Sequence, residues 1–371
     1  MIRTATLDDV AQLLRLENAC FETDRLSRRQ FRYMLTRANA VVLVDAGEET
    51  LRGYVLILFS RGTSMARLYS IAVDPNARGG GVARSLVLAA EAESRERDCA
   101  YLRLEVRKDN TASLGLFHAM GYRKFDERED YYEDHMDAWR FEKSLAPNLA
   151  PDLGQVVYYE QTLDFTCGPA ALMMAMKSLE PTMALDRKLE LRLWREATTI
   201  YMTSGHGGCG PFGLALAAAR RGFNTEIYVS DAGVHLIDTV RSEEKKTVIR
   251  LVQEDMRDEL LQMGVPIHYE SLSLDDLERH FNAGGLPVVL ISSYQIYEER
   301  FPHWVVITGF DEHFVYANDP FVDYDNNETS VDSINMPIHK RNFQRMARYG
   351  RAGLRAVLML YKGTDPVGEH A

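Results

Sequence analysis

Hydrophobic and polar positions switch between helical and strand spacing several times along the first 145 residues. Strands that lead into and out of helices in this way indicate a mixed α/β layer. The pattern predicts helices over about 8–20, 27–36, 81–97 and 110–119, and strands near 40–46, 51–59, 67–73, 101–107, 122–126 and 134–142.

The rest of the chain places its helices first and most of its strands last, which predicts an α+β domain with an antiparallel sheet. The basic stretch 340–355 has alternating apolar positions and favours an amphipathic helix over a nucleic-acid patch. The pattern predicts helices over 167–178, 184–203, 212–221, 252–263 and 273–282, and strands over 156–161, 224–229, 287–293, 303–310, 314–318 and 356–362.

A composition change separates these two patterns. The segment SLAPNLAPDLG, residues 144–154, holds two prolines and a glycine between better patterned stretches, as linkers do. The sequence therefore predicts an α/β (α+β) chain with one domain over 1–145, a linker over 146–154 and a second domain over 155–371.

Composition narrows the class of protein. A chain of 371 residues that is 46% hydrophobic and 26% charged is typical of globular domains. The longest apolar runs have strand length, so we expect no membrane span, and the first residues lack the apolar core of a signal peptide. Four separated cysteines without a CxxC pair predict reduced thiols and a cytoplasmic protein.

Charge is distributed unevenly between the halves. Residues 1–145 carry 22 Lys+Arg and 23 Asp+Glu, whereas residues 146–371 carry 21 and 31. This balance argues against a nucleic-acid partner, which needs clustered cations. The acidic second half could attract basic peptide segments, although a solvated acidic surface that keeps the chain soluble is the simpler interpretation.

A glycine-rich turn lies between a strand and a strong amphipathic helix in residues 68–93. Consecutive glycines at Gly79–Gly81 let backbone amides approach a ligand closely, and a helix N-terminus presents unpaired N–H groups to it. This arrangement predicts an anion site for a phosphate or pyrophosphate. The alternative is a tight loop with Arg78 as a solvated cation.

The same turn carries a family resemblance. RGGGVA fits the acetyl-CoA signature R/Q-x-x-G-x-G/A at Arg78, Gly81 and Ala83. Together with IAVDP, the ATLDD opening and LEVRKDNTASLGLFHAMGY (104–122), it makes residues 1–145 resemble the ribosomal-protein branch of the GNAT N-acetyltransferase family. The resemblance implies a twisted sheet split open by a bulge and acetyl-CoA as co-substrate. It also implies that the pyrophosphate lies on the amides of Gly79, Gly80, Gly81, Val82 and Ala83, that amides near Ala72 and Val73 hold pantetheine, and that Asn110 approaches the pantetheine arm.

The resemblance implies that Glu105, in the LEVR strand, acts as general base directly or through water. An ordinary charged residue facing solvent is the alternative. The tyrosine that usually protonates the leaving thiolate, twelve residues later, is replaced by Phe117, which cannot donate a proton. Tyr131 or Tyr132 could substitute for it.

In the second half, Cys167 stands immediately before Gly-Pro and a long apolar helix. Proline is well tolerated in a first helical turn, so the helix start is predictable and the thiol lies at its positive end. This position favours a thiolate nucleophile over a buried structural cysteine.

A nucleophilic cysteine needs a base and an oxyanion donor. Gln161, upstream on the approach loop, could point its amide at the same oxyanion as the Cys167 N–H. His303 and Asp319 are candidates for base and orienter: a hairpin turning at Asp311–Glu312 would place them opposite each other, within imidazole–carboxylate bonding distance. The alternatives are a half-exposed strand-end histidine and an ordinary Asx-turn aspartate.

The segments DFTCGPAA, HWVVITGF and YANDPF resemble the bacteriocin leader (double-glycine) peptidase-like family of papain-fold cysteine peptidases, over about residues 155–362. In that family the matching positions are the nucleophile Cys167, the base His303, the orienter Asp319 and the oxyanion residue Gln161. This chain differs in lacking a transporter domain and in its long insert around GHGGCGPFG.

That insert, residues 205–213, holds His206 and Cys209, but further metal ligands at a familiar spacing are missing, so we expect no metal. A glycine-rich loop that lines a peptide groove is favoured instead. The tyrosines at 294, 297 and 316 and the acidic residues Glu298, Glu299, Asp323 and Asp325 could line a cleft for a basic or extended peptide, or be ordinary surface residues.

The sequence thus predicts an acetyl-CoA-dependent N-acetyltransferase fused to a cysteine peptidase that cleaves an amide bond or transfers an acyl group. A peptide or small protein, with a preference for basic segments, is the expected partner of both sites. Two alternatives stay open: the second domain only binds and presents peptides, or the first is an acetyl-CoA sensor that regulates the peptidase.

Overall fold

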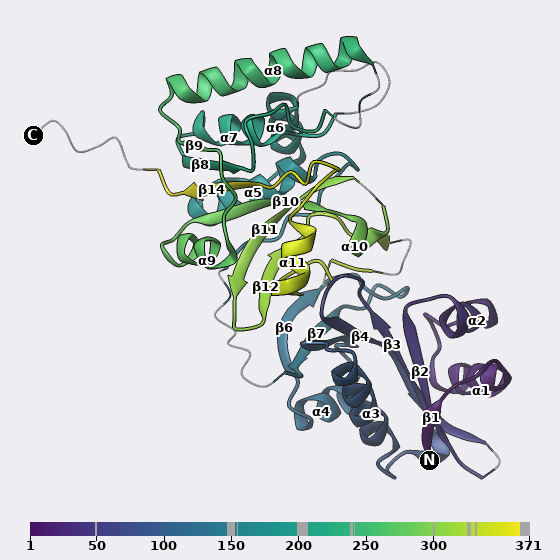
Figure 1. Ribbon diagram of the computed structural model, residues 1–371. Coiled ribbons are helices and arrows are strands. Elements are labelled where there is room, and N and C mark those ends of the chain that lie inside the picture. Colours follow the sequence, from purple (N-terminus) through teal and green to yellow (C-terminus); the bar gives the residue numbers. More distant parts are fainter. Residues whose placement is uncertain are drawn as a thin grey trace, which may run out of the picture. The chain divides into compact units, whose positions relative to one another are not determined.

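The computed structural model describes residues 1–48, 50–146, 153, 155–198, 207–237, 240, 242–299, 301–324, 328–330 and 332–363. The chain divides into two compact units, residues 1–150 and 151–371 (Figure 1). Most of the predicted linker 146–154 lies outside the described residues, so that boundary stays a prediction.

The first unit is built on a seven-stranded sheet in the order β1-β2-β3-β4-β5-β7-β6. Residues 42–45 and 53–57 of its strands are buried at consecutive positions, as strands covered by helices on both faces require. The strands are β1 (Ile2–Thr4), β2 (Ala40–Ala46), β3 (Leu51–Phe59), β4 (Met65–Val73), β5 (Tyr101–Arg107), β6 (Arg123–Arg128) and β7 (Ala138–Ser144).

The sheet opens between its two central strands. β4 and β5 are parallel and pair only over Met65–Arg67 and Tyr101–Arg103. On its other edge β4 shifts register against β3, because Leu56 pairs with Ser70 whereas Ile57 pairs with Leu68, which leaves Tyr69 as the bulged residue. The split sheet and bulge that the sequence predicted are therefore confirmed.

Helices cover both faces of this sheet. One core contains Leu13, Phe31 and Tyr54 and packs beneath two helices, whereas a second core contains Leu86, Leu104 and Phe117 on the opposite face. The helices are α1 (Val10–Cys20) and α2 (Arg28–Thr36) on one face, and α3 (Val82–Glu96) and α4 (Thr111–Ala119) on the other.

The second unit also has a seven-stranded sheet, in the order β13-β12-β11-β10-β14-β8-β9. All pairs are antiparallel except β8 with β9, so the predicted α+β class with a mainly antiparallel sheet is confirmed. The strands are β8 (Asn224–Val229), β9 (Ile267–His268), β10 (Leu286–Ser292), β11 (Pro302–Phe310), β12 (Phe314–Asn318), β13 (Met336–His339) and β14 (Ala356–Tyr361).

Two hydrophobic cores lie on the two faces of this second sheet. One contains Leu172, Leu216, Leu260 and Trp304, and the other contains Leu277, Phe343 and Met359. The first is covered by α5 (Cys167–Leu179), α6 (Arg187–Ala197), α7 (Pro211–Ala219) and α8 (Glu243–Gln262), and the second by α9 (Leu274–Asn282), α10 (Tyr294–Tyr297) and α11 (Lys340–Met346).

Three predicted elements of this unit are wrong. Residues 156–161 form no strand, because they make single bonds to the loop after β12, such as Gln161 N–H to the Pro320 carbonyl, and no ladder. The helix predicted over 184–203 ends at Ala197, and residues 199–206 lie outside the described part. The basic helix predicted over 340–355 ends at Met346 and is followed by a tight hairpin.

Among the helices of the described residues, none combines the length and the apolar character that crossing a lipid bilayer requires.

Candidate active sites

Cys167 is the first residue of α5, as predicted, and its side chain is partly exposed. Gly168 permits the close approach of this helix end to its neighbours: a Cβ there would lie 3.2 Å from Cys209 Cβ, Leu214 Cδ1 and Trp304 Cδ1. The glycine after the cysteine therefore seats the helix start against β11, which carries the candidate base.

His303 and Asp319 form a buried pair. His303 Nε2 lies 2.6 Å from Asp319 Oδ1, and the two side chains are 1% and 0% exposed. The backbone N–H of Phe321 donates to the same Oδ1 at 2.8 Å. Because Nε2 is used by the carboxylate, Nδ1 is the ring nitrogen left for the thiol.

The directly opposed register predicted for this pair is wrong. Phe310 pairs with Val315, so the hairpin turns at Glu312–His313, one residue later than predicted, and beyond a bulge at Thr308 Val306 pairs with Asn318. Asp319 follows the end of β12, so its carboxylate reaches His303 along a diagonal. The contact between the two side chains was predicted, whereas the register that joins their strands was not.

The electrostatics of His303 suit an acid–base group. Burial lowers its pKa, but the charges of Asp319 and Cys167 and their hydrogen bonding to the ring outweigh burial and raise the pKa to about 10. His303 therefore carries a proton at neutral pH. An imidazolium beside the thiol stabilises a thiolate, the form that attacks carbonyl carbons.

Tyr297 completes the surroundings of Asp319. Its hydroxyl donates to Asp319 Oδ2 at 2.8 Å, and its ring lies edge-on to His303 and to Phe321. Burial and the nearby carboxylate raise the pKa of Tyr297 well above its usual value, so it stays a neutral donor. The hypothesis that Tyr294, Tyr297 and Tyr316 together line a peptide cleft is wrong for Tyr316, which is buried and donates to Asp311.

Gln161 is nearly buried at 9% exposure, with its backbone N–H bonded to Pro320 beside Asp319. Its Nε2 donates one hydrogen to the Leu163 carbonyl at 2.8 Å, which leaves the second amide hydrogen for another acceptor. The predicted oxyanion residue is thus fixed on the loop that approaches Cys167.

A buried carboxylate that sequence reasoning missed holds this loop. Glu190 on α6 is 0% exposed and accepts from Thr162 N–H at 2.8 Å, from Thr162 Oγ1 at 2.7 Å and from the Tyr159 hydroxyl at 3.0 Å. Thr166, the residue before Cys167, also donates to it. Only the helical amphipathic pattern marked this position, and that pattern gave no sign of its partners.

Cys209 does not compete with Cys167 as nucleophile. It is 3% exposed, and burial raises its pKa well above the usual thiol value, which keeps it protonated. Its carbonyl accepts the indole N–H of Trp304 at 3.1 Å. His206 and Asp325, singled out in the sequence, lie outside the described residues. Among the described residues, no three His, Cys, Asp or Glu side chains are placed to hold a metal ion.

In the first unit, the glycine turn leads into α3 as predicted. Gly79 and Gly81 both have φ of +78°, a left-handed conformation that favours glycine. Gly81 is the N-cap of α3 and makes no side-chain hydrogen bond to the helix start. The first turn of α3 also contains no acidic residue. The amides from Val82 onward are therefore free to bind an anion.

The other residues assigned to the cofactor lie around this turn. Arg78 Nε donates to the Val73 carbonyl at 3.3 Å, whereas Ala72 is 3% exposed. β4 runs on to Val73 beyond its last pairing with β5 at Arg67. Asn110 caps α4, with its carbonyl oxygen accepting from Ser113 N–H at 3.0 Å, so its amide nitrogen is the part that can reach a ligand.

Glu105 does not face solvent, so that alternative is wrong. Its side chain is 5% exposed, and Arg67, 4% exposed, donates from Nε to Glu105 Oε2 at 3.0 Å. The second oxygen, Oε1, is buried and has no hydrogen-bond partner among the residues that the structure describes. Arg67 also donates to the Tyr131 hydroxyl at 2.7 Å, so one guanidinium joins the candidate base to one of the two candidate tyrosines.

Phe117 is 2% exposed and packs edge-on against Tyr122 in the core. Its position can supply no proton. Burial raises the pKa of both Tyr131 and Tyr132 above the usual tyrosine value. Tyr131 contacts the Glu105–Arg67 pair, whereas Tyr132 lies under the Arg107 guanidinium.

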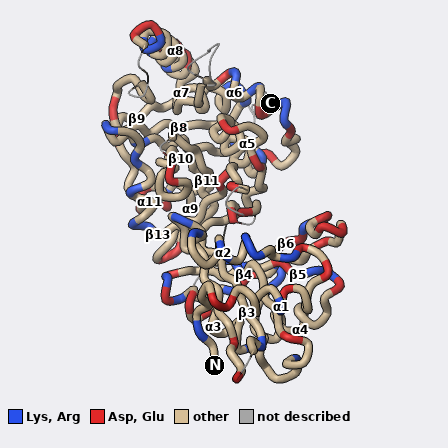
Figure 2. The backbone as a smooth tube through the Cα atoms, turned by 90° about the vertical axis from the view of Figure 1, so that its right-hand side faces the viewer, with Lys and Arg blue, Asp and Glu red and all other residues tan. Residues whose placement is uncertain are grey.

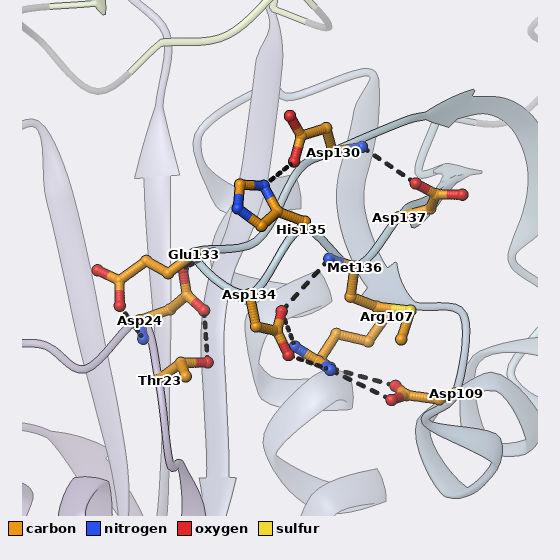
Figure 3. A network of polar contacts seen from close by, with 10 residues as sticks. All are labelled: Thr23, Asp24, Arg107, Asp109, Asp130, Glu133, Asp134, His135, Met136 and Asp137. Carbon is orange, nitrogen blue, oxygen red and sulfur yellow. Dashed lines mark hydrogen bonds and ion pairs between the residues drawn. The ribbon is translucent and has the colours of Figure 1, made fainter.

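The loop that carries Tyr131 and Tyr132 is held by hydrogen bonds and ion pairs on two sides (Figure 3). Arg107 makes paired bonds of 2.9 Å to Asp134, and it also bonds Asp109. On the other side Glu133 and Asp24 exchange backbone-to-carboxylate bonds of 3.2 Å, which tie the loop to the segment between α1 and α2. These bonds hold the loop against the end of β5 and against the segment between α1 and α2.

Comparisons with known proteins assign both halves. Residues 7–122 match the acetyltransferase (GNAT) family, and residues 156–361 match the Peptidase_C39 like family. A Bacillus subtilis (strain 168) protein, whose name marks it as a candidate ribosomal protein bS18-alanine N-acetyltransferase, is 27% identical over 134 residues, 36% of this chain and 87% of its own length.

Other relatives match over shorter stretches. The ribosomal protein bS18-alanine N-acetyltransferase of Escherichia coli (strain K12) is 37% identical over 18% of this chain and 45% of its own length, and the mycothiol acetyltransferase of Streptosporangium roseum is 37% identical over 17% and 18%. The chain thus spans less than half of these two relatives.

A solved structure of the E. coli ribosomal-protein-S18-alanine N-acetyltransferase is 22% identical over 40% of this chain and 98% of its own, with a TM-score of 0.37. From the family matches and the geometry of the two halves, this chain belongs to the Peptidase_C39 like family and carries a GNAT acetyltransferase domain ahead of its peptidase-like domain.

Proposed function

We propose that this protein is a two-domain enzyme that modifies peptides. Its first domain transfers an acetyl group from acetyl-CoA to an amine of a peptide or small protein, and its second attacks an amide bond with Cys167. The observation that carries the proposal is the buried His303–Asp319 pair, 2.6 Å apart, beside a cysteine at a helix N-terminus. The separated, unpaired thiols suit work in the cytoplasm.

In the second domain Asp319 stabilises the His303 imidazolium, which in turn stabilises the Cys167 thiolate. The sulfur attacks the amide carbonyl carbon, and the carbonyl oxygen takes the electron pair. The Cys167 N–H and the free amide hydrogen of Gln161 hold that oxyanion. His303 then gives its proton to the leaving amine. Water, or an acceptor amine, next attacks the thioester, gives its proton to His303 and releases Cys167.

The first domain fits acetyl-CoA as co-substrate. The amides from Gly79 to Ala83 and the cation Arg78 suit a pyrophosphate, since the α3 N-terminus has no capping side chain that competes with it. The strand edge near Ala72 and Val73 and the amide nitrogen of Asn110 would hold the pantetheine arm. Acetyl-CoA supplies an activated thioester when bound. Glu105, through its unpaired Oε1, accepts the proton of the attacking amine.

A second candidate function has its own support. Glu105 is ion-paired with Arg67, and a buried phenylalanine, Phe117, stands where the family has its proton-donating tyrosine. These two features favour an acetyl-CoA sensor that regulates the peptidase-like domain.

Thiol reactivity tests the second domain. The full chain is incubated at neutral pH with limiting iodoacetamide, and labelled cysteines are identified by peptide mass mapping. We expect Cys167 to be labelled first, His303→Ala to slow its labelling by at least about tenfold, and Cys209→Ser, the matched control thiol, to change nothing. Equal labelling of His303→Ala, or preference for Cys209, would contradict the proposal.

Acetyl transfer is tested separately with radiolabelled acetyl-CoA and a panel of peptides with free N-termini or lysines. Transfer that Glu105→Gln abolishes and Cys167→Ala leaves intact supports the acetyltransferase. Binding of acetyl-CoA without transfer to any amine would instead support the sensor. A peptide hydrolysed by wild type and not by Cys167→Ala distinguishes a peptidase from a domain that only presents peptides.

A further inference from the structure

Three arginines share one face of α11 and the residues just after it. Arg341, Arg345 and Arg348 are spaced by four and three positions, which places them on the same side of a helix. Phe343 and Met346 point the other way and are buried in the core, at 2% and 0% exposure. The charged face is therefore turned away from the sheet; around α11 the tube in Figure 2 shows several basic segments in blue.

The hairpin after α11 brings a fourth arginine to this face. Tyr349 and Leu354 exchange two backbone hydrogen bonds of 2.8 Å, which folds residues 350–353 back. Gly353, at φ +70°, leaves room for Arg348: a Cβ there would lie 3.2 Å from its guanidinium. Arg355 follows, with its backbone N–H bonded to Ser230 Oγ at 3.2 Å and its carbonyl to Ser230 N–H.

Together these side chains line one open hollow with a volume of about 490 Å³, which we call the arginine basin. Its lining residues are Arg341, Gln344, Arg345, Arg348 and Arg355. Within the described part of the chain, none of its four arginines makes an ion pair with a carboxylate, whereas Arg220 and Arg221 of the same unit pair with Glu259 and Glu196. Four unneutralised guanidinium groups around one hollow, in the acidic half of the chain, indicate an anionic ligand.

An apolar pocket adjoins the basin. It encloses about 60 Å³ and shares the lining residues Gln344 and Arg355 with the basin, so the two hollows are neighbours. Its apolar lining is formed by Leu272, Leu274, Leu277, Val289, Phe343, Ala347 and Val357. A ligand that fills both must carry negative charges next to one small apolar group.

We propose that the arginine basin is a docking site for an acidic peptide segment with an apolar side chain that enters this pocket. The inference rests on the proposed function only in treating the second domain as one that acts on peptides. Guanidinium groups bind carboxylates through two parallel hydrogen bonds, and the peptide backbone carries alternating side chains to both hollows. A free phosphate or a nucleotide would use the arginines and leave the apolar pocket empty. This face therefore selects acidic segments, in contrast to the basic ones expected from net charge.

Fluorescence anisotropy of the full-length protein tests the proposal with a labelled Leu-Glu-Glu-Asp-Glu peptide. We expect saturable binding that weakens with salt, and loss of binding when Gln and Asn replace the acidic residues. Arg341→Gln/Arg345→Gln is expected to weaken binding at least about tenfold. Arg250→Gln/Arg257→Gln, which removes the same charge from α8, is the matched control and should bind as wild type does. Ala347→Leu, which fills the apolar pocket, should weaken binding of the Leu peptide and leave unchanged the binding of an analogue with Gly in place of Leu.

Unchanged affinity in Arg341→Gln/Arg345→Gln would overturn the proposal. So would binding of pyrophosphate, ATP or single-stranded RNA that is tighter than that of the peptide, is lost in Arg341→Gln/Arg345→Gln and is indifferent to Ala347→Leu, because that pattern describes a phosphate site in the basin itself. Since the assay measures binding alone, Cys167→Ala and Glu105→Gln should bind like wild type. Retained binding alongside absent thiol labelling would refute the proposed chemistry without refuting the docking site.

Discussion

Tyr297 donates a 2.8 Å hydrogen bond to Asp319 Oδ2, the carboxylate oxygen that His303 does not use. The three side chains therefore form a chain of hydrogen bonds in which both oxygens of a fully buried carboxylate are satisfied. Such a chain fixes the rotamer of Asp319 and, through it, the orientation of the imidazole toward Cys167. Tyr297 acts as a positioning residue because it reaches the thiol only through two others.

Tyr297→Phe should keep the fold and loosen this chain. We expect the free energy of unfolding to fall by about 1–2 kcal/mol and the rate of Cys167 alkylation to fall about 3–10-fold, because one hydrogen bond to a carboxylate is lost. The pH profile of alkylation should shift with it, which a merely structural role would not produce. Tyr294→Phe on the same short helix, where Tyr294 is 48% exposed, is the control. An alkylation profile identical to wild type would refute the positioning role.

The raised pKa of His303 makes stability depend on pH. Its value of about 10 in the folded chain lies above the ordinary value of 6.5, so the folded state binds this proton more tightly. The resulting stabilisation is fully present below pH 6.5 and is lost as pH rises through 10. Urea unfolding between pH 6 and pH 10 should therefore show a fall that Asp319→Asn removes, because burial alone lowers the pKa of a histidine. A stability that rises with pH in wild type over this range would contradict the assigned pair.

Arg67 and Glu105 should behave as a coupled buried pair. Arg67→Met leaves the Glu105 carboxylate buried without its cation, and we expect a loss of about 3–5 kcal/mol in unfolding free energy. The double variant Arg67→Met/Glu105→Gln should recover most of that loss, because no charge is then left unpaired. Chemical denaturation of the four proteins in this cycle measures the coupling. Additive effects of the two changes would show that the pair contributes nothing as a pair.

The sequence could predict the members of the thiol site because each has a local signal. Cys167 precedes a proline at a helix start, and His303 and Asp319 flank two short apolar runs joined by a turn. The register between those runs was wrong because the hairpin turns at Glu312–His313 and not at Asp311–Glu312, and this one-residue difference displaces every pair along both strands. The exact contact between His303 and Asp319 therefore required coordinates.

Partners that lie far apart in the chain could not be predicted at all. Arg67 meets Glu105 because β4 and β5 lie side by side, and Glu190 meets Thr162 because α6 packs beside the start of α5. These pairs follow from the order of strands and the packing of helices. In the sequence Arg67 and Glu190 were ordinary charged residues of a strand and a helix.

Glu190 gives a direct test of the loop that carries Gln161. Glu190→Gln replaces an acceptor of several hydrogen bonds with an amide that must also donate, so at least one donor of Thr162 or Thr166 is left unpaired. We expect a loss of about 1–3 kcal/mol in unfolding free energy and slower peptide turnover with less effect on alkylation, since alkylation forms no oxyanion. Glu254→Gln, at an exposed position of α8, serves as control. Equal losses of turnover and alkylation would show that Glu190 acts on Cys167 itself and not on the oxyanion loop.

In the glycine turn of the first domain, two reasons for a glycine can be tested apart: a left-handed backbone conformation and a lack of room for a Cβ. At Gly81 a Cβ would meet nothing within 4 Å, yet φ is +78°, so Gly81→Ala costs about 1–2 kcal/mol through backbone strain alone. If the strain is relieved by turning the amides of the α3 start away, acetyl-CoA binding should weaken about tenfold, which isothermal titration calorimetry measures. Gly80→Ala, where a Cβ would lie at an ordinary 3.5 Å from the Ala77 carbonyl and φ is not left-handed, is the matched control and should bind like wild type. Weaker binding in Gly80→Ala than in Gly81→Ala would mean that close approach of the ligand, and not the left-handed backbone, explains why glycines occupy this turn.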